Sequence, residues 1–242
     1  MRFVRALLMV AALGWPGAQA SAQAADELNA RCVNLGKRFS HDEQVLACTR
    51  ALSLPNRTPE QQAVVYNNRG NAFRTNREYG SALADYDEAI RLDPTYANAY
   101  NNRGIANRAA GLADRAIADF SAALRINPDF ASAYGNRGSA YADRGDLTRA
   151  IADYTRAIEL DEEYSNAYNN RGNLYRQQRR YDLAIADFTA AIRINPEYAV
   201  AYNNRGRTYQ AMGDMTRALD DYEQARRIEP DNSAYQGFGM RQ

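Results

Sequence analysis

Small, aromatic and polar positions recur along most of the chain with a period of 34 residues. Each unit has a tyrosine four residues before a glycine, an alanine twelve residues after that glycine, an aromatic residue four positions later and another alanine three positions later. These slots recur in five consecutive units, at 63–96, 97–130, 131–164, 165–198 and 199–232. Spacings of three and four place them on one face of a helix, and a proline closes four of the five units. The pattern predicts an all-α chain of stacked helical hairpins.

Two charged slots repeat with the same period. The residue before each glycine is arginine, and an aspartate follows sixteen residues later. The pairs are Arg69 and Asp85, Arg103 and Asp119, Arg137 and Asp153, Arg171 and Asp187, and Arg205 and Asp221. Ion pairs between the two helices of a hairpin are one interpretation, because a partly buried arginine without a partner would be unfavourable. The alternative is that these arginines face a groove and hold acidic ligands.

The 34-residue unit, with its tyrosine, glycine, alanine, aromatic and proline slots, closely resembles the tetratricopeptide repeat. Asn107, where an aromatic residue is usual, and Glu162, where proline is usual, depart from that family's pattern. The resemblance implies a right-handed superhelical α-solenoid, since one hairpin cannot bury its apolar face alone. It also implies that the first helix of each pair lines a concave groove.

The resemblance predicts which residues line that groove, at exposed slots of the first helices. They are Asn67, Asn71, Arg74, Asn101, Ile105, Arg108, Asn169, Asn173, Arg176, Asn203 and Arg207. Amides can pair with the main chain of any extended peptide, and the arginines favour acidic or C-terminal segments. Ile105 is a candidate hydrophobic anchor.

A second row of asparagines occupies the next slot in all five units. It consists of Asn68, Asn102, Asn136, Asn170 and Asn204. This row resembles the asparagine ladder in the repeat domain of the O-GlcNAc transferases, which holds peptide main chain. Packing between hairpins is the alternative role. The lysines of the family's carboxylate clamp are absent where Asn67 and Asn101 stand, so that ligand is not implied.

A degenerate hairpin is expected over residues 25–62, ahead of the first full repeat. Thr49-Arg50-Ala51-Leu52 aligns with Thr155-Arg156-Ala157-Ile158, and this register places Cys32 on the glycine slot and Cys48 on the aromatic slot. The two slots face each other across a hairpin, so a disulfide is expected in an oxidising compartment. A turn over Pro55–Glu60 should connect this hairpin to the next.

The first 24 residues have the order of a secretory signal peptide. Arg2 and Arg5 precede the apolar run Ala6–Leu13, and small residues follow, with cleavage expected after Ala20 or Ala24. The apolar run is too short to span a bilayer. We therefore expect a periplasmic or secreted protein.

The other end of the array departs from the pattern in two apolar slots. Asp220 stands where earlier units have alanine, and Arg226 where they have leucine or isoleucine. Polar residues on the outer face are typical of a terminal repeat, which favours a monomer over end-to-end stacking. Residues 233–242 are predicted to be a flexible tail.

Few residues suited to catalysis or cofactor binding are present. His41 is the single histidine, no glycine-rich phosphate loop occurs, and removal of Arg2 and Arg5 would leave a net charge near −1. We expect no enzyme activity, cofactor, metal site or nucleic-acid partner. The predicted function is a protein-interaction scaffold that binds extended peptide segments, in envelope protein assembly; the alternative is an accessory subunit or regulator of an envelope enzyme complex.

Overall fold

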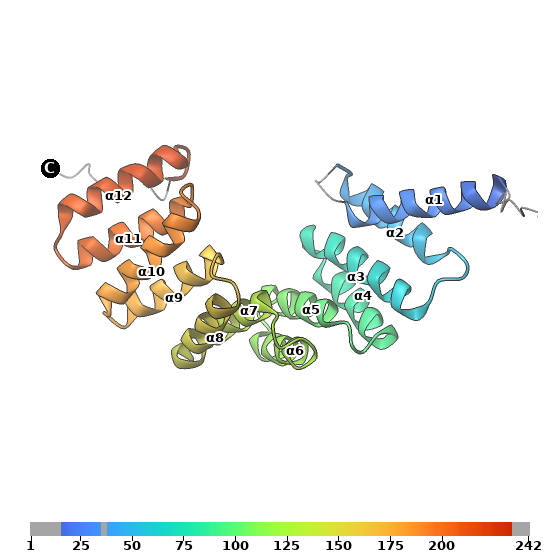
Figure 1. Cartoon of the computed structure of the whole chain (residues 1–242), viewed down its shortest axis with the longest axis horizontal. Coiled ribbons are helices and arrows are strands. Elements are labelled where there is room, and N and C mark those ends of the chain that lie inside the picture. Colours follow the sequence, from blue (N-terminus) through green and yellow to red (C-terminus); the bar gives the residue numbers. More distant parts are fainter. Residues whose placement is uncertain (1–15, 35–37, 234–242) are drawn as a thin grey trace, which may run out of the picture. The chain divides into compact units, whose positions relative to one another are not determined.

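The computed structural model describes residues 16–34 and 38–233, with side chains from residue 25 onward. Within these ranges it contains twelve α-helices and no strand, which confirms the all-α prediction (Figure 1). The chain divides after Pro94 into two units. The first unit contains α1 (Pro16–Val33), α2 (His41–Leu52), α3 (Pro59–Thr75) and α4 (Tyr79–Leu92). The second contains α5 (Ala97–Ala109), α6 (Ala113–Ile126), α7 (Ala131–Asp143), α8 (Leu147–Leu160), α9 (Ser165–Gln177), α10 (Tyr181–Ile194), α11 (Ala199–Ala211) and α12 (Met215–Ile228).

Each odd-numbered helix packs against the even-numbered helix that follows it. The glycine slot permits this close approach. A Cβ atom added to Gly104 on α5 would lie 2.7 Å from the ring of Phe120 on α6, whose side chain is completely buried. The glycine and aromatic slots of the sequence pattern are therefore two sides of one contact.

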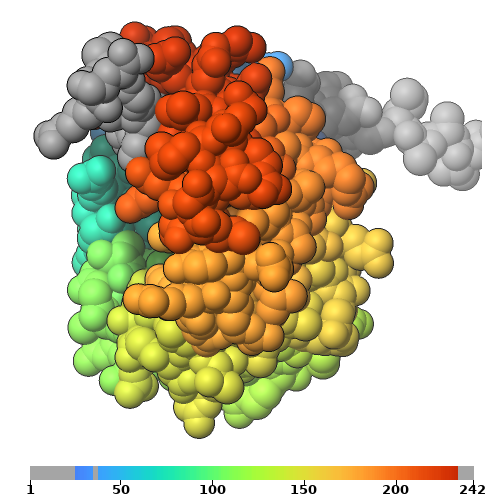
Figure 2. All heavy atoms as spheres, turned by 90° about the vertical axis from the view of Figure 1, so that its left-hand side faces the viewer, coloured from blue at the N-terminus to red at the C-terminus, as the bar shows by residue number. Residues whose placement is uncertain are grey.

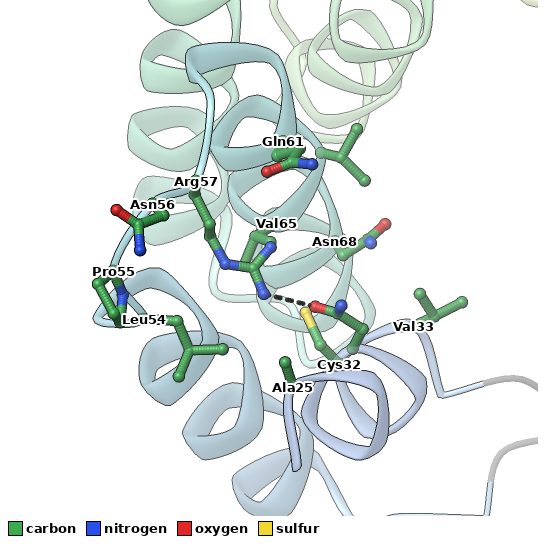
Figure 3. A pocket seen from close by; sticks show the side chains of 12 residues that line it. Ala25, Cys32, Val33, Leu54, Pro55, Asn56, Arg57, Gln61, Val65 and Asn68 are labelled. Atoms are coloured by element: carbon green, nitrogen blue, oxygen red, sulfur yellow. Dashed lines mark hydrogen bonds between the residues drawn. The ribbon is translucent and has the colours of Figure 1, made fainter. Parts of the chain in front are cut away.

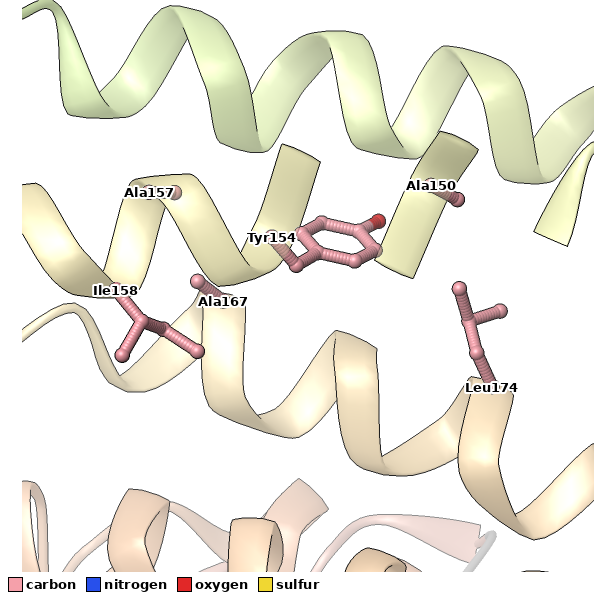
Figure 4. Close-up of a cluster of buried hydrophobic side chains, with 6 residues drawn as sticks. All are labelled: Ala150, Tyr154, Ala157, Ile158, Ala167 and Leu174. Carbon is pink, nitrogen blue, oxygen red and sulfur yellow. The ribbon is translucent and has the colours of Figure 1, made fainter. Parts of the chain in front are cut away.

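Successive hairpins also share a core. In the largest hydrophobic cluster, Ala150, Tyr154, Ala157 and Ile158 of α8 pack with Ala167 and Leu174 of the next hairpin's α9 (Figure 4). A single hairpin could not bury these side chains, because part of the cluster's wall comes from its neighbour. Within each unit the hairpins form one continuous stack.

The leading hairpin is closed by the expected disulfide. Cys32 on α1 and Cys48 on α2 are bonded, with their Cα atoms 4.7 Å apart and both side chains buried. The connection to α3 has the predicted length but lies two residues earlier, running from Ser53 to Thr58. Thr58 and Gln61 form a capping box and Pro59 occupies the first helical turn, so α3 begins at Pro59 and not after Glu60.

The last hairpin has a mixed outer surface. Asp220 and Arg226 are both exposed, as a polar end face requires. Leu219, beside Asp220, is also 44% exposed. Figure 2 shows this hairpin, in red, lying against the α9–α10 hairpin in orange.

Two sequence predictions fall outside the described residues. They are the apolar run Ala6–Leu13 of the signal peptide and the tail after Ser233. The described helix α1 begins at Pro16, inside the segment assigned to the signal peptide. No helix in the described part of the chain is long and apolar enough to cross a membrane.

Candidate protein-binding surface

The repeated arginines are structural. Each guanidinium forms at least two hydrogen bonds with the aspartate of its own hairpin; in the third repeat Arg137 Nε and Nη2 donate to Asp153 over 2.8 and 2.9 Å. The Nε and Nη2 atoms of the other four arginines also donate to their aspartates, and Arg103 Nε is shared between both oxygens of Asp119. All five aspartates are buried, and the hydrogen bonds to Asp153 raise the pKa of Arg137. The ion-pair interpretation is thus the correct one for this row.

Two further contacts hold these arginines, and neither was predicted from the sequence. Each guanidinium lies over the ring of the tyrosine three residues earlier, as Arg171 does over Tyr168. Arg171 Nη1 also donates to Thr155 Oγ1 on the second helix of the preceding hairpin. Arg69, Arg137 and Arg205 reach Thr49, Ser121 and Thr189 in the same way. The sequence did contain a signal for this contact. In three of these four cases a serine or threonine stands sixteen positions before the arginine.

The asparagines directly before the second row form a first row, Asn67, Asn101, Asn169 and Asn203. The prediction that these side chains are exposed is wrong for three of the four. Asn67, Asn101 and Asn169 are 4%, 7% and 3% exposed. Asn101 Oδ1 accepts a 3.0 Å hydrogen bond from Asn136 Nδ2, and Asn169 Oδ1 accepts a 2.9 Å bond from Asn204 Nδ2. The two asparagine rows therefore meet between adjacent first helices, where buried amides need partners.

The rest of the second row lies beside these pairs. Asn68, Asn102 and Asn170 are half-buried, while Asn204 is 7% exposed. In the third repeat Gly135 replaces the first-row asparagine, and a Cβ atom added there would lie only 2.9 Å from the Tyr164 ring. A side chain larger than hydrogen at position 135 would therefore clash with the Tyr164 ring.

Other predicted groove residues also have partners inside the fold. Asn71 accepts a hydrogen bond from the Tyr86 hydroxyl, and Ile105 packs against the cluster around Phe120. Arg108 on α5 forms an ion pair with Asp143 on α7, with Nε and Oδ2 2.6 Å apart. Asn71, Ile105 and Arg108 are therefore less available to a ligand than the sequence suggested.

Arg176 and Arg207 differ from the arginines described above. Arg176 on α9 is half-buried, its Nε has no hydrogen-bond partner among the described residues, and its Nη2 donates to Asn173 Oδ1 over 3.3 Å. Burial, and then the positive charge of Arg207, lower the pKa of Arg176. No carboxylate in the described ranges forms an ion pair with either arginine. We name Arg176, Arg207 and Asn203 the α9–α11 patch.

Asn203 adds an acceptor to the patch. It lies on α11 one turn before Arg207, and its Oδ1 is buried without a hydrogen-bond partner in the part of the chain that the structure describes. The patch therefore combines two cations that lack an anion with an amide oxygen that lacks a donor. In the first unit, Arg74 on α3 similarly has a buried Nε for which the described residues offer no acceptor.

The histidine, cysteine and acidic side chains of the described part of the chain bear on the expectation of no metal site. No group of three histidine, cysteine or acidic side chains in the described ranges is arranged to hold a metal ion. His41 lies at the start of α2, with Nε2 3.0 Å from Glu78 and its ring edge-on to Phe73.

Comparison with known families identifies the repeats. Models described as tetratricopeptide repeat match residues 97–130, 165–198 and 199–232, and a model described as TPR repeat matches 70–111 and 138–178. Among curated proteins, no sequence matches this chain.

Several solved structures are similar. The crystal structure of MamA has 27% identity and a TM-score of 0.60, covering 66% of this chain and 94% of MamA. YrrB, described as a TPR protein with an unusual peptide-binding site, has 27% identity and a TM-score of 0.59, covering 79% of this chain and 96% of YrrB. PilF of Pseudomonas aeruginosa has 18% identity and a TM-score of 0.75, covering 90% of this chain and 98% of PilF. This similarity is one of fold alone. With repeat models matched along most of the array and a helical-hairpin structure, the chain belongs to the tetratricopeptide-repeat family.

Proposed function

We propose that this protein is a non-catalytic scaffold that binds an extended, acidic segment of a partner protein at the α9–α11 patch. The observation that carries the proposal is Arg176, half-buried beside Arg207 with no carboxylate partner among the described residues. In the Arg–Asp row, by contrast, each arginine is matched by an aspartate of its own hairpin. A carboxylate from outside would complete the same arrangement here.

The polar groups of the patch favour a peptide over a small anion. Asn203 Oδ1 needs a donor, which a peptide N–H supplies and a simple carboxylate does not. YrrB, described as having an unusual peptide-binding site, supports the general class of ligand. A few such contacts, set against the cost of ordering a peptide, predict an affinity near the micromolar range.

Titration calorimetry with two decapeptides tests the proposal. One carries four glutamates and the other carries glutamine at the same places, so the two differ only in charge. We expect binding of the first alone, and a loss of roughly tenfold in affinity in each of Arg176→Gln and Arg207→Gln. Arg193→Gln, an exposed arginine on α10, removes the same charge outside the patch and should bind normally. Equal binding of both peptides, or equal loss in all three variants, would disprove the proposal.

We further propose that the protein acts as a monomer in the periplasm or as a secreted protein, in envelope protein assembly. The signal-peptide pattern of residues 1–24 and the Cys32–Cys48 disulfide support an oxidising compartment. Cell fractionation with a thiol-alkylation gel shift tests the compartment: the chain should be found outside the cytoplasm with both cysteines protected from alkylation.

A further inference from the structure

The first unit contains a cavity that the proposed function does not use. It has a volume of about 640 Å³ and lies between α1, the α2–α3 connection and α3 (Figure 3). Pockets of this size, mostly apolar with a few placed polar groups, are typical of small-molecule sites. All its lining residues fall between Ala25 and Asn68, far in sequence from the α9–α11 patch.

The α2–α3 connection forms one wall of this pocket. It runs from Ser53 to Thr58, two residues longer than the Asp93–Tyr96 connection between α4 and α5. The extra length places Leu54, Pro55 and Arg57 at the cavity. The longer connection therefore contributes a substantial part of the pocket wall.

The helices on either side of the cavity supply apolar surface. Val33 on α1 and Val64 on α3 both line it and are 43% and 42% exposed, while Cys32 and Val65 are buried against it. An apolar ligand that covers these valines would remove their surface from water, which favours binding.

Arg57 is the single charged residue of the described lining. Its Nη2 donates a 2.7 Å hydrogen bond to Asn29 Oδ1, and its Nε is buried with no acceptor among the described residues. The other polar lining residues are the amides Asn29, Asn56, Gln61 and Asn68, so no carboxylate of this described lining balances the charge. A half-buried cation with one neutral partner favours an anionic ligand.

We propose that this pocket binds a small amphiphilic carboxylate, a molecule with an apolar body and one carboxylate group. The carboxylate would accept hydrogen bonds from Arg57, and the apolar body would cover Val33, Val64 and Val65. The single positive charge matches one carboxylate. The apolar walls exclude a small hydrophilic anion as the preferred ligand.

Calorimetry with decanoate, below its micellar concentration, and the full-length oxidised protein tests the proposal. Decan-1-ol has an alkyl chain of the same length without the charge, and its affinity should be at least about tenfold lower than that of decanoate. Arg57→Gln should lose about tenfold in decanoate affinity, and Val64→Asp should abolish binding. The matched controls are Arg50→Gln and Val200→Asp, which change an exposed arginine on α2 and an exposed valine on α11. Both variants should bind decanoate with the affinity of the unchanged protein.

The outcomes separate this pocket from the α9–α11 patch. Arg176→Gln and Arg207→Gln should retain decanoate binding, while Arg57→Gln should retain both helicity and the acidic-peptide affinity. Absence of decanoate binding, equal binding of decanoate and decan-1-ol, or unchanged affinity in Arg57→Gln would overturn the proposal. The proposal would also be overturned if a hexapeptide with a free C-terminal carboxylate displaced decanoate and bound more tightly, since the pocket would then be a site for a chain terminus.

Discussion

Asn136 on α7 donates a 3.0 Å hydrogen bond to Asn101 on α5, and so joins two successive hairpins through residues that the sequence suggested would face a ligand. Asn101→Ala would leave the Asn136 amide without this acceptor in a half-buried position. We expect the free energy of unfolding to fall by about 1 to 2 kcal/mol. Urea denaturation followed by circular dichroism measures the change.

Asn98→Ala on the same helix is the matched control, since Asn98 is exposed; its effect should stay within about 0.5 kcal/mol. A cycle with Asn101→Ala, Asn136→Ala and the double variant isolates the pair. Additive effects would contradict a direct interaction. A change confined to ligand affinity would restore the original groove interpretation of Asn101.

The buried ion pairs should be far more sensitive to substitution than the exposed ones. Asp153→Ala removes both carboxylate acceptors of Arg137 and leaves its charge beside a buried cavity, so we expect a loss of roughly 2 to 4 kcal/mol in unfolding free energy. Asp143→Ala breaks the exposed pair with Arg108 and should cost at most about 1 kcal/mol. A loss in Asp153→Ala no larger than the one in Asp143→Ala, at most about 1 kcal/mol, would show that the Arg–Asp row contributes little.

The glycine slot can be tested with two alanine substitutions. In Gly104→Ala the new methyl group would lie 2.7 Å from the buried Phe120 ring, which should destabilise the protein by about 1 to 3 kcal/mol. Gly80→Ala on α4 meets no atom within 4 Å and should be neutral or stabilising by up to about 1 kcal/mol. Thermal denaturation compares the two, and an unchanged melting temperature in Gly104→Ala would be contrary to this packing.

Loss of the disulfide should weaken the first hairpin specifically. The bond closes a loop between residues 16 positions apart, worth about 3 kcal/mol in the chain-entropy model. In Cys32→Ser/Cys48→Ser we expect faster amide hydrogen exchange over residues 25–52, with little change from α5 to α12. Uniformly faster exchange along the chain would instead indicate a single cooperative unit.

Alkaline pH should reveal the burial of Tyr86. Burial of its hydroxyl raises the pKa of Tyr86 from 10.0 to about 12. Because the folded state holds this proton more tightly than the unfolded state, the stabilising contribution is complete below about pH 10 and is lost as the pH rises toward about 12. Tyr86→Phe should show a smaller fall in unfolding free energy between about pH 9.5 and 11.5, measured by urea denaturation. An identical fall in both proteins would mean that Tyr86 ionises as freely as an exposed tyrosine.

The fold could be predicted from the sequence because each slot of the 34-residue unit has one packing role. Gly104 and Phe120, or Arg137 and Asp153, have fixed spacing, and the fold brings them together in every repeat. The Cys32–Cys48 bond followed from the same register, and the structure confirms it.

The surface was harder to predict, because spacing alone does not say how closely two first helices approach. Asn101 and Asn169 occupy slots that are exposed on an isolated hairpin and become buried when the next hairpin packs beside them. Arg108 and Arg176 occupy the same slot in different repeats, but of these two only Arg108 pairs with an aspartate on the neighbouring first helix of the described chain. Such differences depend on single residues of the adjacent repeat.

The Arg–Asp pairs have a consequence for how the array can evolve. Both members of each pair belong to the same 34-residue unit, so duplication or deletion of one whole unit adds or removes the arginine and the aspartate of this row together. A new repeat arrives with its own internal counterion, and its loss leaves no buried arginine of this row behind in the described hairpins. The length of the array can therefore change by whole repeats without disturbing the charge balance of the hairpins that remain.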